Sequence, residues 1–93
     1  MGVEYRVETY DFKRANIAEA LRNRRITIQE MPDVVRIWET PDPDGMPSVE
    51  VNMGADVANL VIYGGSSEFT EMMMGLIMML LVKVNDHVVL SRV

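Results

Sequence analysis

The side chains best suited to chemistry in this chain are few, and they lie apart in the sequence. His87 is the single histidine and follows Asp86, so these two form the one candidate acid–base pair built on an imidazole. The serines do not fall in the Gly-X-Ser-X-Gly pattern of a nucleophile elbow, and the chain has no cysteine. We therefore expect no catalytic residue, no metal ligand set and no cofactor, and the sequence favours a non-enzymatic protein.

The turn Gly64-Gly65-Ser66-Ser67 could instead bind a small anionic ligand. It lies between an expected strand and an expected helix, where free backbone amides can hold a phosphate group. Its spacing matches neither the dinucleotide nor the P-loop pattern, and Glu68 and Glu71 would repel phosphate. A turn that caps the helix is the simpler interpretation. A small-ligand or catalytic site near residues 64–67 and His87 remains the first alternative function.

Two further stretches imitate metal sites. Within residues 40–51, Asp42, Asp44 and Gly45 match three positions of an EF-hand calcium loop, but a valine stands at the last position, where that loop requires glutamate. The prolines around these residues favour the turn of a β-hairpin instead. Five methionines within residues 72–79 could offer thioether sulfur to Cu(I), but without cysteine they are more typical of flexible core side chains.

The basic side chains cluster in one expected helix, and Arg22, Arg24 and Arg25 stand at its end. Arginines there suit the negative end of the helix dipole, and they could also contact an acidic partner. The whole chain has a net charge of −5, which opposes a general affinity for nucleic acid. We keep the three arginines as possible partner-binding residues and a nucleic-acid-binding module as the second alternative function, although the charge disfavours it.

The composition indicates one compact domain over residues 1–93. Apolar residues make up 48% of the chain and charged residues 25%, close to the averages for soluble globular proteins. The uncharged apolar stretch over residues 72–82 is shorter than the roughly 18–20 residues that a membrane-spanning helix needs. The N-terminal residues alternate and do not have the pattern of a signal peptide. With the absence of cysteine, these features predict a cytoplasmic protein without a membrane segment.

Alternation and turn residues predict the elements that would position these side chains. Strands with one buried face alternate with period two, whereas a more continuous apolar run, as in Ala58–Tyr63, indicates an interior strand. Ser, Thr, Asp and Asn before an apolar periodic segment indicate the start of a helix. The expected elements are strands over 3–10, 34–40, 48–53 and 58–63, a helix over 12–25 capped by Asp11, a helix from Ser66 or Ser67 to about Asn85, and further short strands over 25–30 and 88–93.

The element order β-α-β-β-β-α, with a final strand if residues 88–93 pair, predicts an α+β fold. We expect a two-layer sandwich, with a mostly antiparallel sheet and two helices on one face. The nearest named topology is the ferredoxin-like βαββαβ order, provided that residues 48–63 form one bent strand or a strand plus an edge strand.

The second helix carries more apolar side chains than one sheet can cover. At about 100° per residue, Phe69, Met73, Leu76, Ile77, Leu80 and Val84 fall in one sector, which we expect to lie on the sheet. The opposite sector starts with charged residues and then becomes apolar. The candidate interface residues on this outer side are Met72, Gly75, Met78, Met79 and Val82.

An apolar outer surface and a glycine in the middle of the helix have a common explanation. Gly75 disfavours the helix by about 1 kcal/mol relative to alanine, and it would let another backbone approach closely. We therefore expect the protein to self-associate through its Met-rich helix, most simply as a homodimer, and to act through protein–protein interaction. Two other coverings remain open: the domain's own first helix and C-terminal residues, or a different protein or apolar ligand.

Overall fold

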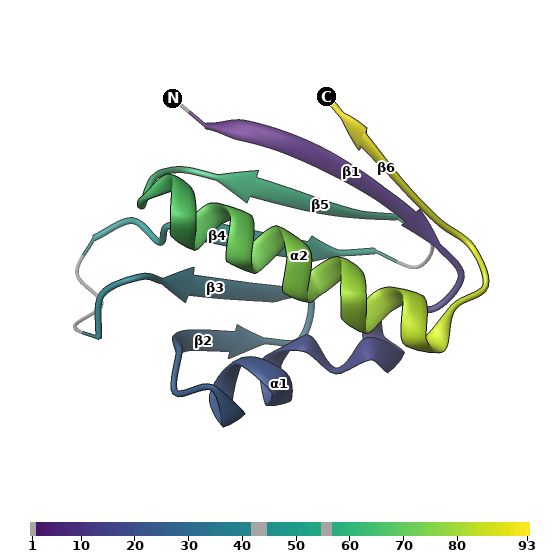
Figure 1. The fold of residues 1–93 in the computed structure, drawn as a ribbon, viewed down its shortest axis with the longest axis horizontal. Coiled ribbons are helices and arrows are strands. Elements are labelled where there is room, and N and C mark those ends of the chain that lie inside the picture. The colour runs from purple at the N-terminus through teal and green to yellow at the C-terminus, as the bar shows by residue number, and fades with distance from the viewer. Residues whose placement is uncertain (1, 42–44, 55–56) are drawn as a thin grey trace.

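A computed structural model describes residues 2–41, 45–54 and 57–93. These residues form a small α+β domain with a six-stranded antiparallel sheet, two α-helices and one 3-10 helix, η1 (Figure 1). The strand order in the sheet is β2-β3-β4-β5-β1-β6. The elements are β1 (Val3–Thr9), η1 (Lys13–Ala15), α1 (Ile17–Asn23), β2 (Thr27–Met31), β3 (Val34–Trp38), β4 (Val49–Met53), β5 (Val57–Ile62), α2 (Ser67–Val84) and β6 (Val88–Arg92).

The N-terminal strand β1 lies inside the sheet. Its alternation is confirmed, because Val7 and Thr9 are buried on the predicted face. Val7 lies opposite Ala58 of β5 on one side and opposite Leu90 of β6 on the other, and both pairings are antiparallel. The continuous apolar run of β5 is also explained, because β5 is an interior strand between β4 and β1.

The hairpin predicted around the proline-rich turn is confirmed. Ile37 of β3 pairs with Val49 of β4, and the Ser48 N–H donates to the Ile37 carbonyl at 2.8 Å. Both flanking elements are strands, in contrast to the helices of an EF-hand. Asp42 and Asp44, the two carboxylates of the imitated calcium loop, lie outside the described residues.

The ferredoxin-like strand order is not confirmed. That topology required residues 48–63 to form one bent strand or a strand plus an edge strand. Instead the chain folds back between β4 and β5, Val51 of β4 pairs with Leu60 of β5, and both strands are interior. The β4–β5 pair therefore stands between β3 and β1. The short strand suggested for residues 25–30 is present as β2, at one edge of the sheet.

The first helix is shorter than predicted, because it is interrupted at Asn16. This residue has a φ of 49°, in the left-handed region that asparagine tolerates better than most side chains. The residue at the N-cap of η1 is Phe12 rather than Asp11, although the Arg14 N–H donates to Asp11 Oδ1 at 3.3 Å. The regular helix α1 then begins only at Ile17.

The end of α1 also uses a left-handed residue. Arg25 has a φ of 58°, a position where glycine is usual. Its N–H donates to the Arg22 carbonyl at 2.9 Å, and the Ile26 N–H donates to the Leu21 carbonyl at 3.1 Å. These two bonds satisfy the last carbonyls of the helix and turn the chain into β2.

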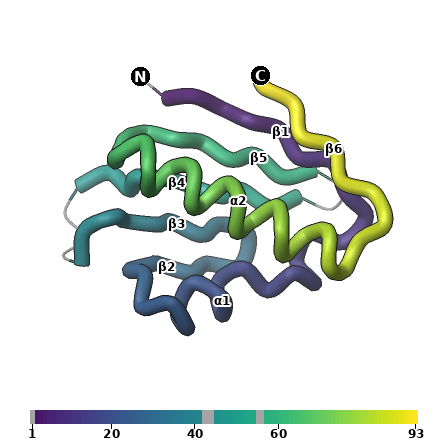
Figure 2. Tube along the Cα trace, viewed as in Figure 1, coloured from purple at the N-terminus to yellow at the C-terminus, as the bar shows by residue number. Residues whose placement is uncertain are grey.

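The long helix α2 lies across the central strands of the sheet (Figures 1 and 2). Its buried side chains join those of the strands and of α1 in one apolar core. The strand residues involved all belong to the same alternating set, so they occupy one face of the sheet. The core contains Phe69, Met73, Leu76, Ile77 and Leu81 from α2, and Val7, Val35, Ile37, Val49, Val51, Ala58 and Leu60 from the strands.

Candidate functional site

The outer surface of α2 is uncovered in the single chain. Met72, Met79 and Val82 expose 49%, 41% and 58% of their surface, and Gly75 lies exposed among them. A Cβ atom built on Gly75 would meet no atom within 4 Å. These four residues, called the α2 outer face below, were all singled out by the sequence, and the fold brings them together on one side of one helix.

Two residues of α2 lie at the border between its buried and its exposed side. Met78, predicted to lie on the outer side, is partly buried and packs against the core. Leu80, which the sequence places on the sheet, is also partly buried and packs against the core, whereas Leu81, which the sequence assigned to neither side, is fully buried. The buried stripe thus shifts around the helix between Phe69 and Leu81. A helix that crosses a twisted sheet presents different sides along its length, which a straight helical wheel does not include.

The α2 outer face is not covered by the other elements of the described chain. Figure 1 shows α1 beside β2 and β6 beside β1, at opposite edges of the sheet. Both η1 and β6 make contacts with α2. Met72, Met79 and Val82 retain their exposure despite these contacts. Cover by the first helix and the C-terminal residues is therefore incomplete within the residues described.

The start of α2 is held by Glu39 and Ser66. Ser66, rather than Ser67, is the N-cap, because its hydroxyl oxygen accepts a hydrogen bond from the Phe69 N–H at 3.1 Å. The Glu39 carboxylate accepts from the Ser66 N–H at 2.7 Å and from the Ser66 hydroxyl at 2.8 Å. Gly65 has a φ of 92°, and a Cβ atom there would lie 3.0 Å from Glu39 Oε1. The amide that a phosphate would need is therefore already bound to a carboxylate of the same chain.

Glu39→Gln is expected to lower stability at neutral pH but to have no effect in acid. The backbone N–H of Ser66, followed by its hydroxyl, holds the pKa of Glu39 below its ordinary value of 4.5. A carboxyl group whose pKa is lower in the folded than in the unfolded state stabilises the fold above the unfolded pKa. This stabilisation is lost as the pH falls through the folded pKa. Urea unfolding of both proteins at neutral pH and at several values below 4.5 measures the difference.

The matched control for this prediction is Glu71→Gln. It removes the same charge from the exposed second turn of α2, away from the Ser66 cap. The prediction is contradicted if the stability difference between wild type and Glu39→Gln stays constant as the pH is lowered.

The two segments of the small-ligand alternative do not meet. Residues 64–67 precede α2 and His87 follows it, so they lie near opposite ends of this helix. Its 18 residues span roughly 27 Å. Gly64, Gly65 and Ser67 border one shallow depression, whereas His87 borders another. A single site built from both segments is therefore not formed by this fold.

His87 lies at the surface in the turn between α2 and β6. Its ring centroid is 5.9 Å from that of Tyr10, and its carbonyl accepts a hydrogen bond from Thr9 Oγ1 at 3.0 Å. Arg6 and Glu8 border the same depression and form an ion pair with each other at 3.2 Å. These contacts fix the turn to β1 and leave the imidazole exposed.

The three predicted partner-binding arginines lie together at the end of α1. Arg22 forms an ion pair with Glu30 of β2, and Arg24 Nη1 donates to the Ala20 carbonyl at 3.3 Å. Arg25 occupies the left-handed position that ends the helix. All three arginines are exposed. An acidic partner would have to compete with Glu30 for Arg22, which weakens the case for phosphate recognition here.

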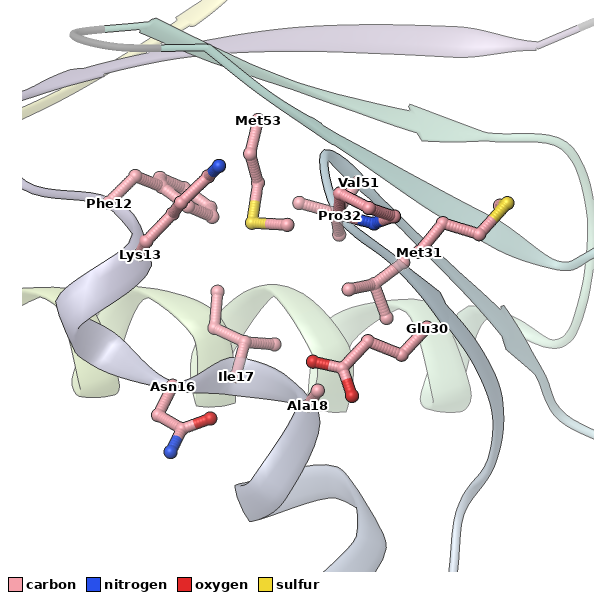
Figure 3. A pocket seen from close by; sticks show the side chains of 11 residues that line it. Phe12, Lys13, Asn16, Ile17, Ala18, Glu30, Met31, Pro32, Val51 and Met53 are labelled. Carbon is pink, nitrogen blue, oxygen red and sulfur yellow. The ribbon is translucent and has the colours of Figure 1, made fainter.

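The sequence did not predict an apolar hollow beside α1. It has a volume of about 340 Å³ and lies between the η1–α1 segment and the β2–β3 turn (Figure 3). Phe12, Ile17 and Met53 contribute to its mainly apolar walls. Small-molecule sites typically have about 300–1,000 Å³, so the hollow is at the lower end of that range. The residue that could have indicated this hollow is Asn16. The helix is broken at Asn16, so the η1–α1 segment does not pack evenly on the strands.

Within the described residues, no helix combines the length and apolar character that crossing a membrane requires. In the same part of the chain, no three histidine, aspartate or glutamate side chains are grouped so that they could hold a metal ion. Comparison with protein-family models, curated protein sequences and solved structures found no match to this chain.

Proposed function

We propose that this protein is a small, non-enzymatic cytoplasmic protein that acts through protein–protein interaction and self-associates through the α2 outer face, most simply as a homodimer. The proposal depends on one observation: Met72, Met79 and Val82 remain exposed around a glycine that has open space above it. The absence of cysteine and the acidic balance of the chain favour the cytoplasm as the compartment.

The energetics favour a partner at this surface. Burying a methionine or valine side chain completely is worth about 1.5–3 kcal/mol, and the three side chains here are each roughly half exposed. A second α2 helix crossing at Gly75 would cover them together and place two helix backbones close to each other. Association through the same surface on both copies is closed by a two-fold axis, so it ends at a dimer.

A two-layer arrangement of the domain would make α2 the outermost element on its side. We infer that both helices cover the same face of the sheet, because Leu21 of α1 and Ile77 of α2 belong to one core cluster with Val35 and Leu60. In this arrangement the back of α2 projects furthest from the sheet, where a second copy can reach it without displacing any strand.

The test is the mass in solution of wild type and Val82→Glu at micromolar concentration, measured by light scattering. Wild type is expected to be a dimer, and Val82→Glu to be a folded monomer, because a dimer would bury the new carboxylate in an apolar contact. Val82 is exposed in the single chain, so the substitution should leave the fold intact. Circular dichroism of the variant checks its folding.

Met46→Glu is the control, because it also replaces an exposed apolar side chain by glutamate. Met46 is 67% exposed and lies in the β3–β4 connection. It is expected to remain dimeric. A monomeric wild type would refute the proposal, and a folded Val82→Glu dimer would place the contact on another surface.

Binding of a small apolar molecule is the second candidate function. The hollow of about 340 Å³ beside α1 offers such a molecule a more enclosed site than the depressions at residues 64–67 and at His87. Methyl resonances of Met31 and Met53, which border the hollow, report on its occupancy. Shifts of these two resonances on adding a small apolar compound, with Met79 unmoved, would favour this candidate over self-association.

A further inference from the structure

The two edges of the sheet differ in how they resist pairing with another strand. At the β2 edge, Gln29 and Glu30 are exposed, Pro32 follows the strand, and α1 lies beside it. Charged residues and proline are common protections of an edge strand. At the other edge, Val89 and Leu90 of β6 are 37% and 40% exposed. The β6 edge has neither a proline nor a charged residue before Arg92.

Every second residue of β6 directs its backbone N–H and C=O groups away from the sheet, where no other strand of the described residues lies. The Val93 N–H donates to the Glu4 carbonyl of β1 at 3.0 Å. The backbone N–H and C=O groups of successive residues in an antiparallel strand point alternately to the two sides of the strand. Since Val93 points these groups to β1, the odd-numbered residues of β6 do so as well. Val88, Leu90 and Arg92 therefore direct their N–H and C=O groups to the open edge. Figure 2 shows β6 as the outermost strand, and in the sheet that the described residues form its neighbour is β1.

We propose that β6 pairs antiparallel with β6 of a second copy of this chain. The alternation restricts the possible registers of this pair. A residue whose backbone groups point to the open edge must lie opposite a residue of the second copy whose backbone groups also point to that edge. One permitted register places Val89 opposite Val89 of the second copy, with Val88 opposite Leu90 on either side. This register covers the exposed Leu90 side chain with an apolar partner.

Charge complementarity favours this register over its neighbours. Asp86 lies in the bend two residues before β6, where it would come close to Arg92 of the second copy, and the two-fold axis repeats this pair on the other side. Within the described part of the chain, neither residue takes part in a salt bridge. A register shifted by two residues would instead place Arg92 opposite Val88 and leave Asp86 without a cation.

The β6 contact is separate from the α2 outer face. A two-fold axis perpendicular to the sheet relates the two strands, so one continuous sheet would run through both copies, with both α2 helices on the same side. The edge contact covers fewer apolar side chains than the helix contact, so we expect weaker association, at higher concentrations. In the wild type it would join α2-linked dimers into larger assemblies.

The test uses charge reversal in the Val82→Glu background, so that the α2 contact does not contribute. Sedimentation equilibrium at hundreds of micromolar is expected to show that the mass of Val82→Glu approaches a dimer. Adding either Asp86→Arg or Arg92→Asp should lower the association constant by about tenfold or more, because both ion pairs become repulsive. An equimolar mixture of these two variants should restore association, because each repelling residue then faces its opposite charge.

Hydrogen exchange of backbone amides gives an independent readout. The Leu90 N–H should become protected as the concentration rises, whereas the Val89 N–H, bonded within the sheet, should change little. The proposal is overturned if the mass of Val82→Glu does not depend on concentration. It is also overturned if the mixture of the two charge-reversal variants associates as weakly as each variant alone. A monomeric wild type at micromolar concentration would refute the α2 dimer but not this contact, so the two failures are distinguishable.

Discussion

Leu81→Ala is expected to lower the free energy of unfolding by about 2–5 kcal/mol, as large-to-small substitutions in a packed core usually do. Leu81 is fully buried near the C-terminal end of α2 and belongs to the same core cluster as Leu21 and Val7. Removing its side chain leaves a cavity that the sheet and helix can fill only in part. Urea unfolding followed by circular dichroism measures the loss.

Leu80→Ala is the matched control for this prediction. It deletes the same atoms one residue earlier, where the side chain is only partly buried. We expect a clearly smaller loss of stability than for Leu81→Ala. If the Leu80 substitution were the more damaging, α2 would lie on the sheet as the straight helical wheel places it. The comparison therefore tests the orientation of the helix. Both measurements are made in the Val82→Glu background, where dimer formation does not add to the apparent stability.

Gly75→Leu is expected to stabilise the folded monomer and to weaken the dimer. In the Val82→Glu background the free energy of unfolding should rise by about 0.5–1 kcal/mol, because leucine favours a helix over glycine and meets open space here. With Val82 intact, the added side chain separates the two helix backbones. The dimer dissociation constant should then rise by about tenfold or more, which corresponds to at least 1.4 kcal/mol.

The opposite signs make this variant informative. A glycine that serves only the fold of the monomer would give a loss of stability and no change in association. Thermal unfolding gives the first quantity, and light scattering over a dilution series gives the second. A variant that is more stable and still a tight dimer would show that no partner backbone approaches Gly75.

The local elements were predictable because their signals lie within short stretches of sequence. The alternation in Val3–Thr9 and the cap at Ser66 each depend on residues a few positions apart, and both are confirmed. The exposed positions of Met72, Gly75, Met79 and Val82 were predictable for the same reason. The helical period alone separates them from Phe69 and Met73.

What could not be predicted depends on contacts between distant residues. The interruption at Asn16 is a left-handed conformation that a run of good helix formers does not reveal. The choice of Leu81 over Leu80 depends on how α2 crosses the sheet. The position of the β4–β5 pair between β3 and β1 depends on which strands meet in three dimensions. The hollow beside α1 results from the interruption at Asn16, so it could not be predicted from the sequence either.

The place of β1 in the sheet has a consequence for how the chain folds. β1 is the earliest strand in the sequence, yet its neighbours are the last two, with Tyr5 opposite both Leu60 and Arg92. Pairs so far apart require the closure of long loops, and such topologies fold slowly. During synthesis the strands β2 to β5 can pair with their sequence neighbours first. We expect β1 to insert late, together with β6, so that two strands join the sheet in one step.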